Sequence, residues 1–251
     1  MQPVLETIER VAPTDANVLI TGESGCGKGL IARLIHEARR GASAASITVN
    51  IGSLAETVFE SEMFGHVKGA FTDAKNDRVG RFELADGGTL FLDEIANIPS
   101  RSRRGCCCAC SRTASSSGSA RRGRSSADVR VLAATNADID GEISAGRFRA
   151  RPAVSLEHDP LHLPALRERG DDILRLAQRS SSQHAQHRRR GVTAFSEPAL
   201  SALRRYSWPG NVREAQSRHR ARRADGARHG HRARGSAARR WRPRRRPIAG
   251  R

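Results

Sequence analysis

The residues with the clearest chemistry form the stretch GESGCGKG near the N-terminus. Gly22, Gly25 and Gly27 let a loop curl until successive backbone N–H groups point inward, and such a cradle binds phosphate oxygens. Lys28 would reach the β- and γ-phosphates of a nucleotide, because the spacing G-x4-G-K is typical of a phosphate-binding loop. Gly29 stands where a Ser or Thr usually contacts Mg²⁺. The candidate nucleotide-binding residues of this loop are Gly22, Glu23, Ser24, Gly25, Cys26, Gly27, Lys28 and Gly29.

Two adjacent acids supply the second candidate for chemistry. Asp93 and Glu94 end an apolar run in the stretch DGGTLFLDEI, residues 86–95. Acids at the end of a buried strand are costly unless they serve a charge. In a nucleotide hydrolase, Asp93 would organise Mg²⁺ through water and Glu94 would polarise the attacking water. We therefore interpret the pair as candidate catalytic residues.

The elements around these motifs are those that such a site requires. We expect a helix over residues 3–11 and a short strand over residues 18–20. A second helix after the loop is predicted by apolar residues at helical spacing, namely Leu30, Ile31, Leu34 and Ile35. Strand, glycine-rich loop and helix are the context of a phosphate site. The expected fold is an α/β core with a mainly parallel sheet and nucleotide at the carboxyl ends of its strands.

Beyond these motifs, the sequence resembles the central AAA+ domain of sigma-54-dependent transcription activators, the bacterial enhancer-binding proteins. The resemblance rests on ESEMFGHVKGAFTDAKNDRVGRFELADGGTLFLDEI, ADVRVLAATNADI, AGRFR, LHLPALRERGDDI and FSEPALSALRRYSWPGNVRE. It implies an AAA+ P-loop NTPase core over residues 1–163 and a small helical lid over residues 164–216. It also implies ATP and Mg²⁺ as cofactors, a homo-oligomeric ring, usually a hexamer, and the sigma-54 RNA polymerase holoenzyme as the partner that ATP hydrolysis remodels.

The resemblance assigns roles to individual residues of the nucleotide site. Asn50 in VNIG matches the asparagine that gates the catalytic Glu94. Thr135 and Asn136 in AATN match sensor I, which reads the γ-phosphate. Arg213 in WPGNVRE matches the sensor II arginine of the helical lid.

Two further motifs of the family act between molecules. Arg149 in GRFR matches the first of two arginine fingers that work across the subunit interface, and Ser155 occupies the place of the second. The family's loop GAFTGA contacts sigma-54 and reads GAFTDA here, with Asp73 in place of a glycine. A charged side chain at a flexible loop tip is expected to stiffen the loop or to repel acidic partners. The candidate partner-binding residues are Gly69, Ala70, Phe71, Thr72, Asp73 and Ala74.

The net charge of +18 lies almost entirely in two arginine-rich segments. Residues 101–126 hold seven Arg and no acid, and residues 217–251 hold fourteen Arg and one acid, so the remaining chain is near neutral. Both segments have almost no Leu, Ile, Val or Phe, and we expect them to be disordered. Such a tail would bind nucleic acid nonspecifically at low salt.

A shifted reading frame accounts for the composition of these segments. Leu-Leu-Arg-Val, which fits the family at this place, can be written CTG CTG CGC GTG, and one base on it reads Cys-Cys-Ala-Cys, as residues 107–110 do. The hypothesis is that residues 101–126 are out of frame and that the tail after WPGNVRE is as well. A zinc site is the weaker interpretation, because CCCAC lacks a distant partner pair.

These departures from the family leave three functional hypotheses open. The first is a sigma-54 activator ATPase whose hydrolysis is impaired, the second an inactive nucleotide-binding remnant of a damaged gene, and the third a basic nucleic-acid-binding protein acting through its tail. No apolar run approaches the roughly 18 residues that span a bilayer, so we expect no membrane partner and a cytoplasmic location. No sensory domain is expected before Met1, and no helix-turn-helix after the lid.

Overall fold

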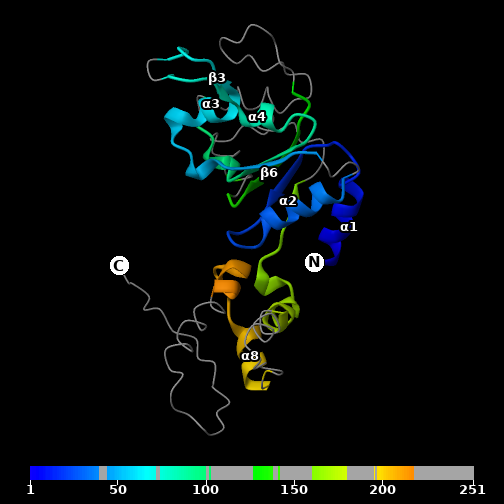
Figure 1. Ribbon diagram of the computed structural model, residues 1–251. Helices are drawn as coiled ribbons and strands as arrows, with labels where there is room; N and C mark the ends of the chain where they lie inside the picture. The colour runs from blue at the N-terminus through cyan, green and yellow to red at the C-terminus, as the bar shows by residue number, and fades with distance from the viewer. Residues whose placement is uncertain are drawn as a thin grey trace, which may run out of the picture. The chain divides into compact units, whose positions relative to one another are not determined.

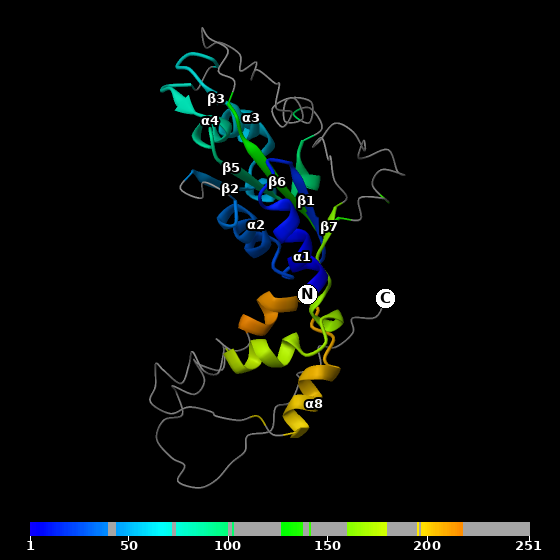
Figure 2. The same ribbon diagram turned by 90° about the vertical axis from the view of Figure 1, so that its right-hand side faces the viewer.

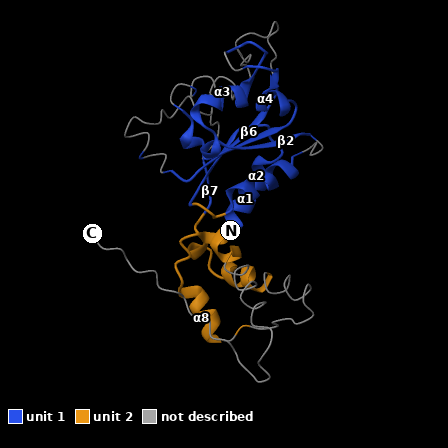
Figure 3. Ribbon diagram, turned by 60° about the vertical axis from the view of Figure 1, so that its left-hand side comes forward, with its two compact units in different colours: residues 1–23, 27–163 blue, residues 24–26, 164–251 orange. Residues whose placement is uncertain are grey.

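The computed structural model describes residues 1–39, 44–71, 74–99, 102, 127–137, 141, 160–179, 195 and 197–217. The chain divides into two compact units (Figure 3). The first unit comprises Met1–Glu23 and Gly27–Leu163, and the second comprises Ser24–Cys26 and Pro164–Arg251. The tip of the glycine-rich loop is thus part of the same unit as the lid.

A five-stranded sheet in the order β2-β5-β6-β1-β7 forms the centre of the first unit (Figure 1). All of its paired neighbours run parallel, which confirms the predicted α/β fold. The strands are β1 Val18–Thr21, β2 Ser46–Asn50, β5 Thr89–Asp93, β6 Arg130–Thr135 and β7 Leu161–His162. The predicted strand over residues 18–20 is one residue longer in the structure.

The central strands form because their side chains are apolar on both faces. The side chains of β6 are buried throughout, and those of β5 are buried up to the half-exposed Asp93. Strands covered on both faces are typical of parallel sheets flanked by helices. The register pairs Leu92 with Ala133 and Val18 with Leu132, so the carboxyl ends of β5, β6 and β1 lie at one edge of the sheet.

Helices cover both faces of this sheet (Figures 1, 2 and 3). On one face, α3 (Glu56–Phe64) and α4 (Arg81–Leu84) bury aromatic and aliphatic side chains against every second residue of the strands. On the other face, α2 (Lys28–Glu37) contacts β1, β5 and β6 and also packs on α1 (Gln2–Val11). The core on the α3 side contains Leu19, Val49, Phe59, Met63, Phe82, Leu90, Leu92, Val131 and Ala133.

Two short 3-10 helices and a small hairpin complete the first unit. The 3-10 helices η1 (Ile51–Ser53) and η2 (Ile95–Asn97) follow β2 and β5 directly. The hairpin pairs β3 (Gly65–His66) with β4 (Arg78–Val79) in antiparallel fashion. Its base is tied to α3, because Glu62 forms ion pairs with Arg78 and Arg81.

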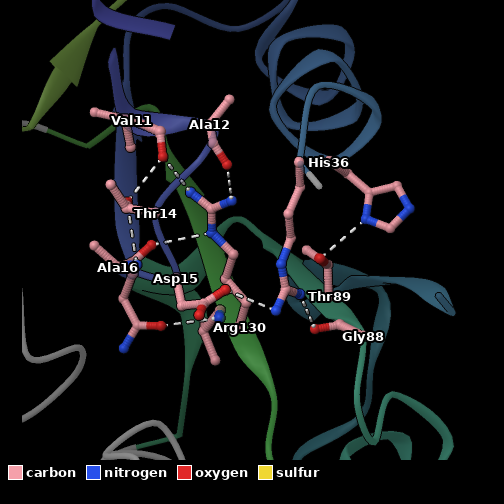
Figure 4. A network of polar contacts seen from close by, with 12 residues as sticks. Val11, Ala12, Thr14, Asp15, Ala16, His36, Gly88, Thr89 and Arg130 are labelled. Atoms are coloured by element: carbon pink, nitrogen blue, oxygen red, sulfur yellow. Dashed lines mark hydrogen bonds and ion pairs between the residues drawn. The ribbon is translucent and has the colours of Figure 1, made fainter. Parts of the chain in front are cut away.

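A buried polar network fixes the end of α1 to the start of β6 (Figure 4). Arg130 is only 3% exposed, and its guanidinium donates hydrogen bonds to three backbone carbonyls. Its Nε bonds to Ala16 at 3.1 Å, its Nη1 to Ala12 at 3.0 Å and its Nη2 to Val11 at 3.0 Å. A cation at a helix C-terminus complements the helix dipole as well as its unpaired carbonyls.

A second polar group lies beside it at the start of β5 (Figure 4). His36, buried on α2, shares a hydrogen bond of 2.9 Å between its Nδ1 and Thr89 Oγ1. Arg39 donates to the Gly88 carbonyl at 3.2 Å and forms a 2.7 Å ion pair with Asp15. Burial and the nearby Arg39 cation lower the pKa of His36 below its ordinary value of 6.5.

The second unit is helical and has a small core of its own. It contains η3 (Leu166–Glu168), a helix over residues 172–179, α8 (Glu197–Arg205) and a helix over residues 211–217. Trp208 is buried at its centre, donates from Nε1 to the Leu203 carbonyl at 2.9 Å and meets Tyr206 edge to face. The other buried members of this core are Leu166, Ile173, Ala177, Leu203 and Ala215.

Candidate nucleotide-binding and hydrolysis site

The glycine-rich loop leaves β1 and enters α2, as the sequence predicts. Gly27 caps α2 with a φ of 108°, a left-handed conformation that favours glycine. Lys28 is buried, and its Nζ donates to the carbonyls of Gly22 at 2.9 Å and Glu23 at 3.0 Å. The ammonium is thus held at the mouth of the loop, at the amino end of a helix.

The backbone of the loop offers unpaired donors. Among the described residues, no acceptor receives a hydrogen bond from the N–H of Gly25 or Gly27. Gly25 has a φ of 78°, again in the left-handed region. Free N–H groups in a curled glycine loop before a helix are the arrangement that binds phosphate.

The paired acids follow β5 at the same edge of the sheet. Asp93 accepts a 3.0 Å hydrogen bond from the Glu94 N–H through its Oδ1. Glu94 has a φ of 60°, which is unusual for a residue with a side chain and marks a sharp turn after the strand. Its carboxylate accepts from Asn97 Nδ2 at 3.2 Å and lies against Gly52, so closely that a Cβ there would collide with it.

Asn50 lies beside the acids but has another partner. The sheet register places it opposite Asp93 on the neighbouring strand. Its Oδ1 accepts from the Ser53 N–H at 3.2 Å and so caps η1. The residue that hydrogen-bonds to Glu94 is Asn97, which sequence reasoning missed because nothing in the run DEIAN distinguishes its amide from that of a surface residue.

Thr135 ends β6 next to the phosphate loop. The register pairs it with Thr21, the last residue of β1, and its side chain is fully buried. Its Oγ1 accepts from the Ala137 N–H at 3.0 Å, and Asn136 is exposed after the strand. The carboxyl ends of β1, β2, β5 and β6 thus bring the loop, Asn50, the acid pair and Thr135 to one edge.

Arg213 lies in the second unit together with the loop tip. Its Nη1 donates to Ser24 Oγ at 3.2 Å, and its backbone N–H donates to the Gly25 carbonyl at 3.2 Å. Arg169 and Asn211 also bond to the loop tip, and sequence reasoning missed both, although RERGDD and WPGN are polar, turn-forming stretches. Burial lowers the pKa of Arg169 below its ordinary value.

The loop between β3 and β4 carries the residues expected to contact a partner. Gly69 donates to the Ala74 carbonyl at 2.8 Å, and Ala74 returns a 2.9 Å bond to the Phe71 carbonyl. Phe71 is 49% exposed, and its ring packs on His66 at a centroid distance of 4.9 Å. An apolar ring this exposed at a loop tip is suited to protein contact.

Several predicted residues lie outside the described part of the chain. They are Thr72, Asp73, Arg149, Ser155, residues 107–110 and nearly all of the two arginine-rich segments. Cys26 is described, and it is a buried cysteine in the loop tip. Among the described residues, no group of three or more His, Cys, Asp or Glu side chains could hold a metal ion.

Comparison with known proteins identifies the arrangement of loop, acid pair and hairpin. The family model of the sigma-54 interaction domain matches residues 1–158, and that of the AAA+ ATPase lid domain matches residues 167–221. The chain belongs to the sigma-54 interaction domain family. It comprises a sigma-54 interaction domain followed by an AAA+ ATPase lid domain.

The relatives of this domain are longer regulatory proteins. The alginate biosynthesis transcriptional regulatory protein AlgB of Pseudomonas syringae is 45% identical over 220 residues, 86% of this chain and 48% of AlgB. The transcriptional regulatory protein ZraR of Salmonella typhimurium is 44% identical over 218 residues, 86% of this chain and 49% of ZraR. The chain therefore spans about half the length of the curated relatives it matches.

Solved structures show the same fold. NtrX from Brucella abortus matches with a TM-score of 0.77 and 31% identity over 90% of this chain and 51% of the NtrX chain. NtrX in complex with ATP matches with a TM-score of 0.73 and 32% identity over 88% of this chain and 50% of that chain. In the described part of the chain, no helix is both long and apolar enough to span a membrane.

Proposed function

We propose that this domain binds ATP in the loop of residues 22–29 and hydrolyses it to remodel the sigma-54 RNA polymerase holoenzyme. The observation that carries the proposal is the edge of the sheet at which the loop, Lys28 and the acid pair meet. The solved structures of NtrX with ADP and with ATP support a nucleotide as the ligand.

The residues present fit a magnesium nucleotide. The free N–H groups of Gly25 and Gly27, the amino end of α2 and the Lys28 ammonium together match the charge of a polyphosphate. Mg²⁺ is usually bound by one or two carboxylates, waters and the phosphates themselves, so Asp93 suffices without a hydroxyl at Gly29. Bound Mg²⁺ would neutralise charge on the phosphates.

The remaining residues would act on the water and on the phosphate. The Glu94 carboxylate would first release its hydrogen bond from Asn97 and then accept a proton from the attacking water. Asn50, on the adjacent strand, would gate this movement of the Glu94 side chain. Thr135 and Asn136 would sense the γ-phosphate at the end of β6.

Other residues would act between molecules or from the lid. Arg213 would read the phosphate state from the lid, and Arg149 would reach a neighbouring subunit of a homo-oligomeric ring. The exposed Phe71 and its loop, residues 69–74, would engage sigma-54.

We further propose that hydrolysis is impaired in this chain. Ser155 replaces the second arginine finger, and a cation at the transferred phosphate is worth about 10³-fold or more in rate. The segment of residues 101–126 also lacks the apolar residues of a packed helix. ATP binding would persist through the loop even where turnover is lost.

A damaged gene is the second candidate, and a shift of reading frame would account for the arginine-rich composition of the tail. Residues 215–223 can be written GCT CAG AGC CGT CAT CGA GCG CGC CGT. One base on, these codons read Leu-Arg-Ala-Val-Ile-Glu-Arg-Ala, an amphipathic helical pattern that would continue the helix over residues 211–217. Sequencing the gene across codons 95–130 and 210–251 decides this, and a clean single frame that relatives share would refute it.

An ATP hydrolysis assay on the full chain tests the proposed function. Wild type should release phosphate slowly, and Lys28→Ala and Glu94→Gln should each reduce the rate to background. Glu94→Gln should still bind ATP, because the loop is unchanged. Phosphate release that neither variant affects would refute the site, and ATP binding without any turnover would favour the inactive remnant.

The arginine-rich tail allows a separate test of nucleic-acid binding. DNA affinity should fall steeply with salt and show no sequence preference, because arginine contacts to phosphate release counterions. Lys28→Ala should leave that affinity unchanged. A sequence preference that persists at high salt would instead favour a selected nucleic-acid function.

A further inference from the structure

Three consecutive backbone carbonyls at the tip of the phosphate loop accept hydrogen bonds from the lid. All of the atoms belong to the second unit. The bonds run from Asn211 Nδ2 to the Ser24 oxygen at 3.1 Å, from the Arg213 N–H to the Gly25 oxygen at 3.2 Å, and from Arg169 Nη2 to the Cys26 oxygen at 2.7 Å.

These bonds determine which way the N–H groups of the loop face. In a planar trans peptide the C=O of one residue and the N–H of the next point in opposite directions, and the chain has no cis bond in its described part. Carbonyls held by the lid therefore turn the N–H groups of Gly25, Cys26 and Gly27 away from the lid donors. Those are the groups that a phosphate cradle uses.

Both polar atoms of the Asn211 side-chain amide form hydrogen bonds. The residue is fully buried, and its Oδ1 accepts from the Leu166 N–H at 2.7 Å while its Nδ2 donates to Ser24. Its φ of 49° lies in the left-handed region, which asparagine adopts more readily than most residues. The amide thus links η3 to the loop tip.

Arg169 makes a similar connection between the lid and the loop tip. Its Nε donates to the Pro164 carbonyl at 2.9 Å, which fixes the guanidinium while Nη2 bonds to Cys26. The tip also approaches the lid very closely, because a Cβ on Gly25 would lie 2.5 Å from the Gly210 oxygen. The contact leaves little freedom for any other loop conformation.

We propose that Asn211 and Arg169 form a lid clamp: they are positioning residues that hold the loop tip in its phosphate-binding conformation. This inference rests on the proposed ATP binding and extends it to two residues without an assigned role. ATP affinity then depends on the hydrogen bonds that Asn211 and Arg169 donate to the loop tip. Arg213 contributes its backbone N–H in the same way.

The test distinguishes the loss of a hydrogen-bond donor to the loop tip from unfolding of the lid, and it uses the full chain. Asn211→Asp keeps the acceptor for Leu166 but replaces the donor to Ser24 with an oxygen. Arg169→Met keeps the aliphatic stem without the guanidinium, and the exposed Arg205→Met is the matched control. Trp208 reports lid folding once Trp241 is replaced by Phe, because the chain has only two tryptophans.

Titration calorimetry with ATP should give clear differences between these variants. Each clamp variant should weaken ATP binding by about fivefold to tenfold, the effect of one lost hydrogen bond, while Trp208 emission stays that of a buried indole. Binding of adenosine, which has no phosphate, should not change between wild type and variant.

The outcomes distinguish the clamp from the proposed function. ATP affinities within twofold of the Arg205→Met control would overturn the clamp, and so would red-shifted Trp208 emission in both variants, which would make the two residues purely structural. If wild type and Lys28→Ala bind ATP equally, the proposed function itself fails, and the clamp with it.

Discussion

Replacing Arg130 with Met would remove the cation that joins α1 to β6. Methionine keeps most of the buried aliphatic volume but none of the donors. The Val11 carbonyl would keep its 3.1 Å bond from the Thr14 N–H and its 2.8 Å bond from Thr14 Oγ1. The carbonyls of Ala12 and Ala16 would lose the donors that the described structure gives them.

The expected loss of stability in Arg130→Met comes from the two carbonyls that would be left without a donor. Ala12 and Ala16 are 1% and 7% exposed, so water cannot readily replace the guanidinium. A buried acceptor without a donor costs about 1–3 kcal/mol, so Arg130→Met should lower the free energy of unfolding by about 2–6 kcal/mol. Against a typical stability of about 5–15 kcal/mol, this loss is a large share of the total.

Urea unfolding followed by far-ultraviolet circular dichroism measures this loss. Arg39→Met is the matched control in the same network. The ion pair of Arg39 with Asp15 lies near the surface, and the Gly88 carbonyl, to which Arg39 also donates, would keep its 3.1 Å bond from the Arg130 N–H. The control should lose no more than about 1 kcal/mol, as surface ion pairs usually do. Equal losses for the two variants, or a loss below 1 kcal/mol for Arg130→Met, would refute the reasoning.

Acidification should weaken the fold through His36, because burial and then Arg39 lower its pKa below 6.5, so the unfolded chain takes up the proton first. Unfolding free energies should be highest above about pH 6.5 and decline below it, and His36→Gln should flatten the decline; an unchanged slope would contradict this. Gly29→Ala should raise the free energy of unfolding, measured in urea, by about 0.5–1 kcal/mol, because alanine restricts the unfolded chain and its Cβ would meet the Phe91 ring at an ordinary 3.6 Å. A lower free energy of unfolding would show that the first turn of α2 needs glycine. Gly52→Ala should displace the Glu94 carboxylate and lower the rate of ATP turnover about tenfold or more, while the midpoint of thermal unfolding stays within a few degrees of wild type. An unchanged rate would show that the observed position of the Glu94 carboxylate is unimportant for turnover.

The parts of the candidate site that the sequence predicts are those encoded by neighbouring residues. The loop was predictable because its glycines, Lys28 and the flanking strand and helix are contiguous in the chain. The acid pair was predictable because Asp93 and Glu94 interrupt an apolar run at a strand end. The parallel sheet was expected from the strand, glycine-rich loop and helix around Lys28 and from the family resemblance, and the structure confirms it.

The parts that sequence reasoning missed depend on contacts between distant residues. Asn211 bonds to Ser24, 187 positions away, and Arg169 bonds to Cys26, 143 positions away. In the sequence, Arg130 is indistinguishable from an ordinary charged residue at the start of a strand. Its hydrogen bonds to the end of α1 form only in the folded chain. The side-chain position of Glu94 is set by the turn after β5, which no local pattern encodes.

Equilibrium binding of ATP to the purified full chain, with and without Mg²⁺, tests the central claim most directly. Wild type should bind ATP, and Lys28→Ala should bind at least about tenfold more weakly, a difference of about 1.4 kcal/mol in binding free energy. If folded wild type has no measurable affinity for ATP, or if Lys28→Ala binds as tightly as wild type, the loop is not a nucleotide site and the account is wrong.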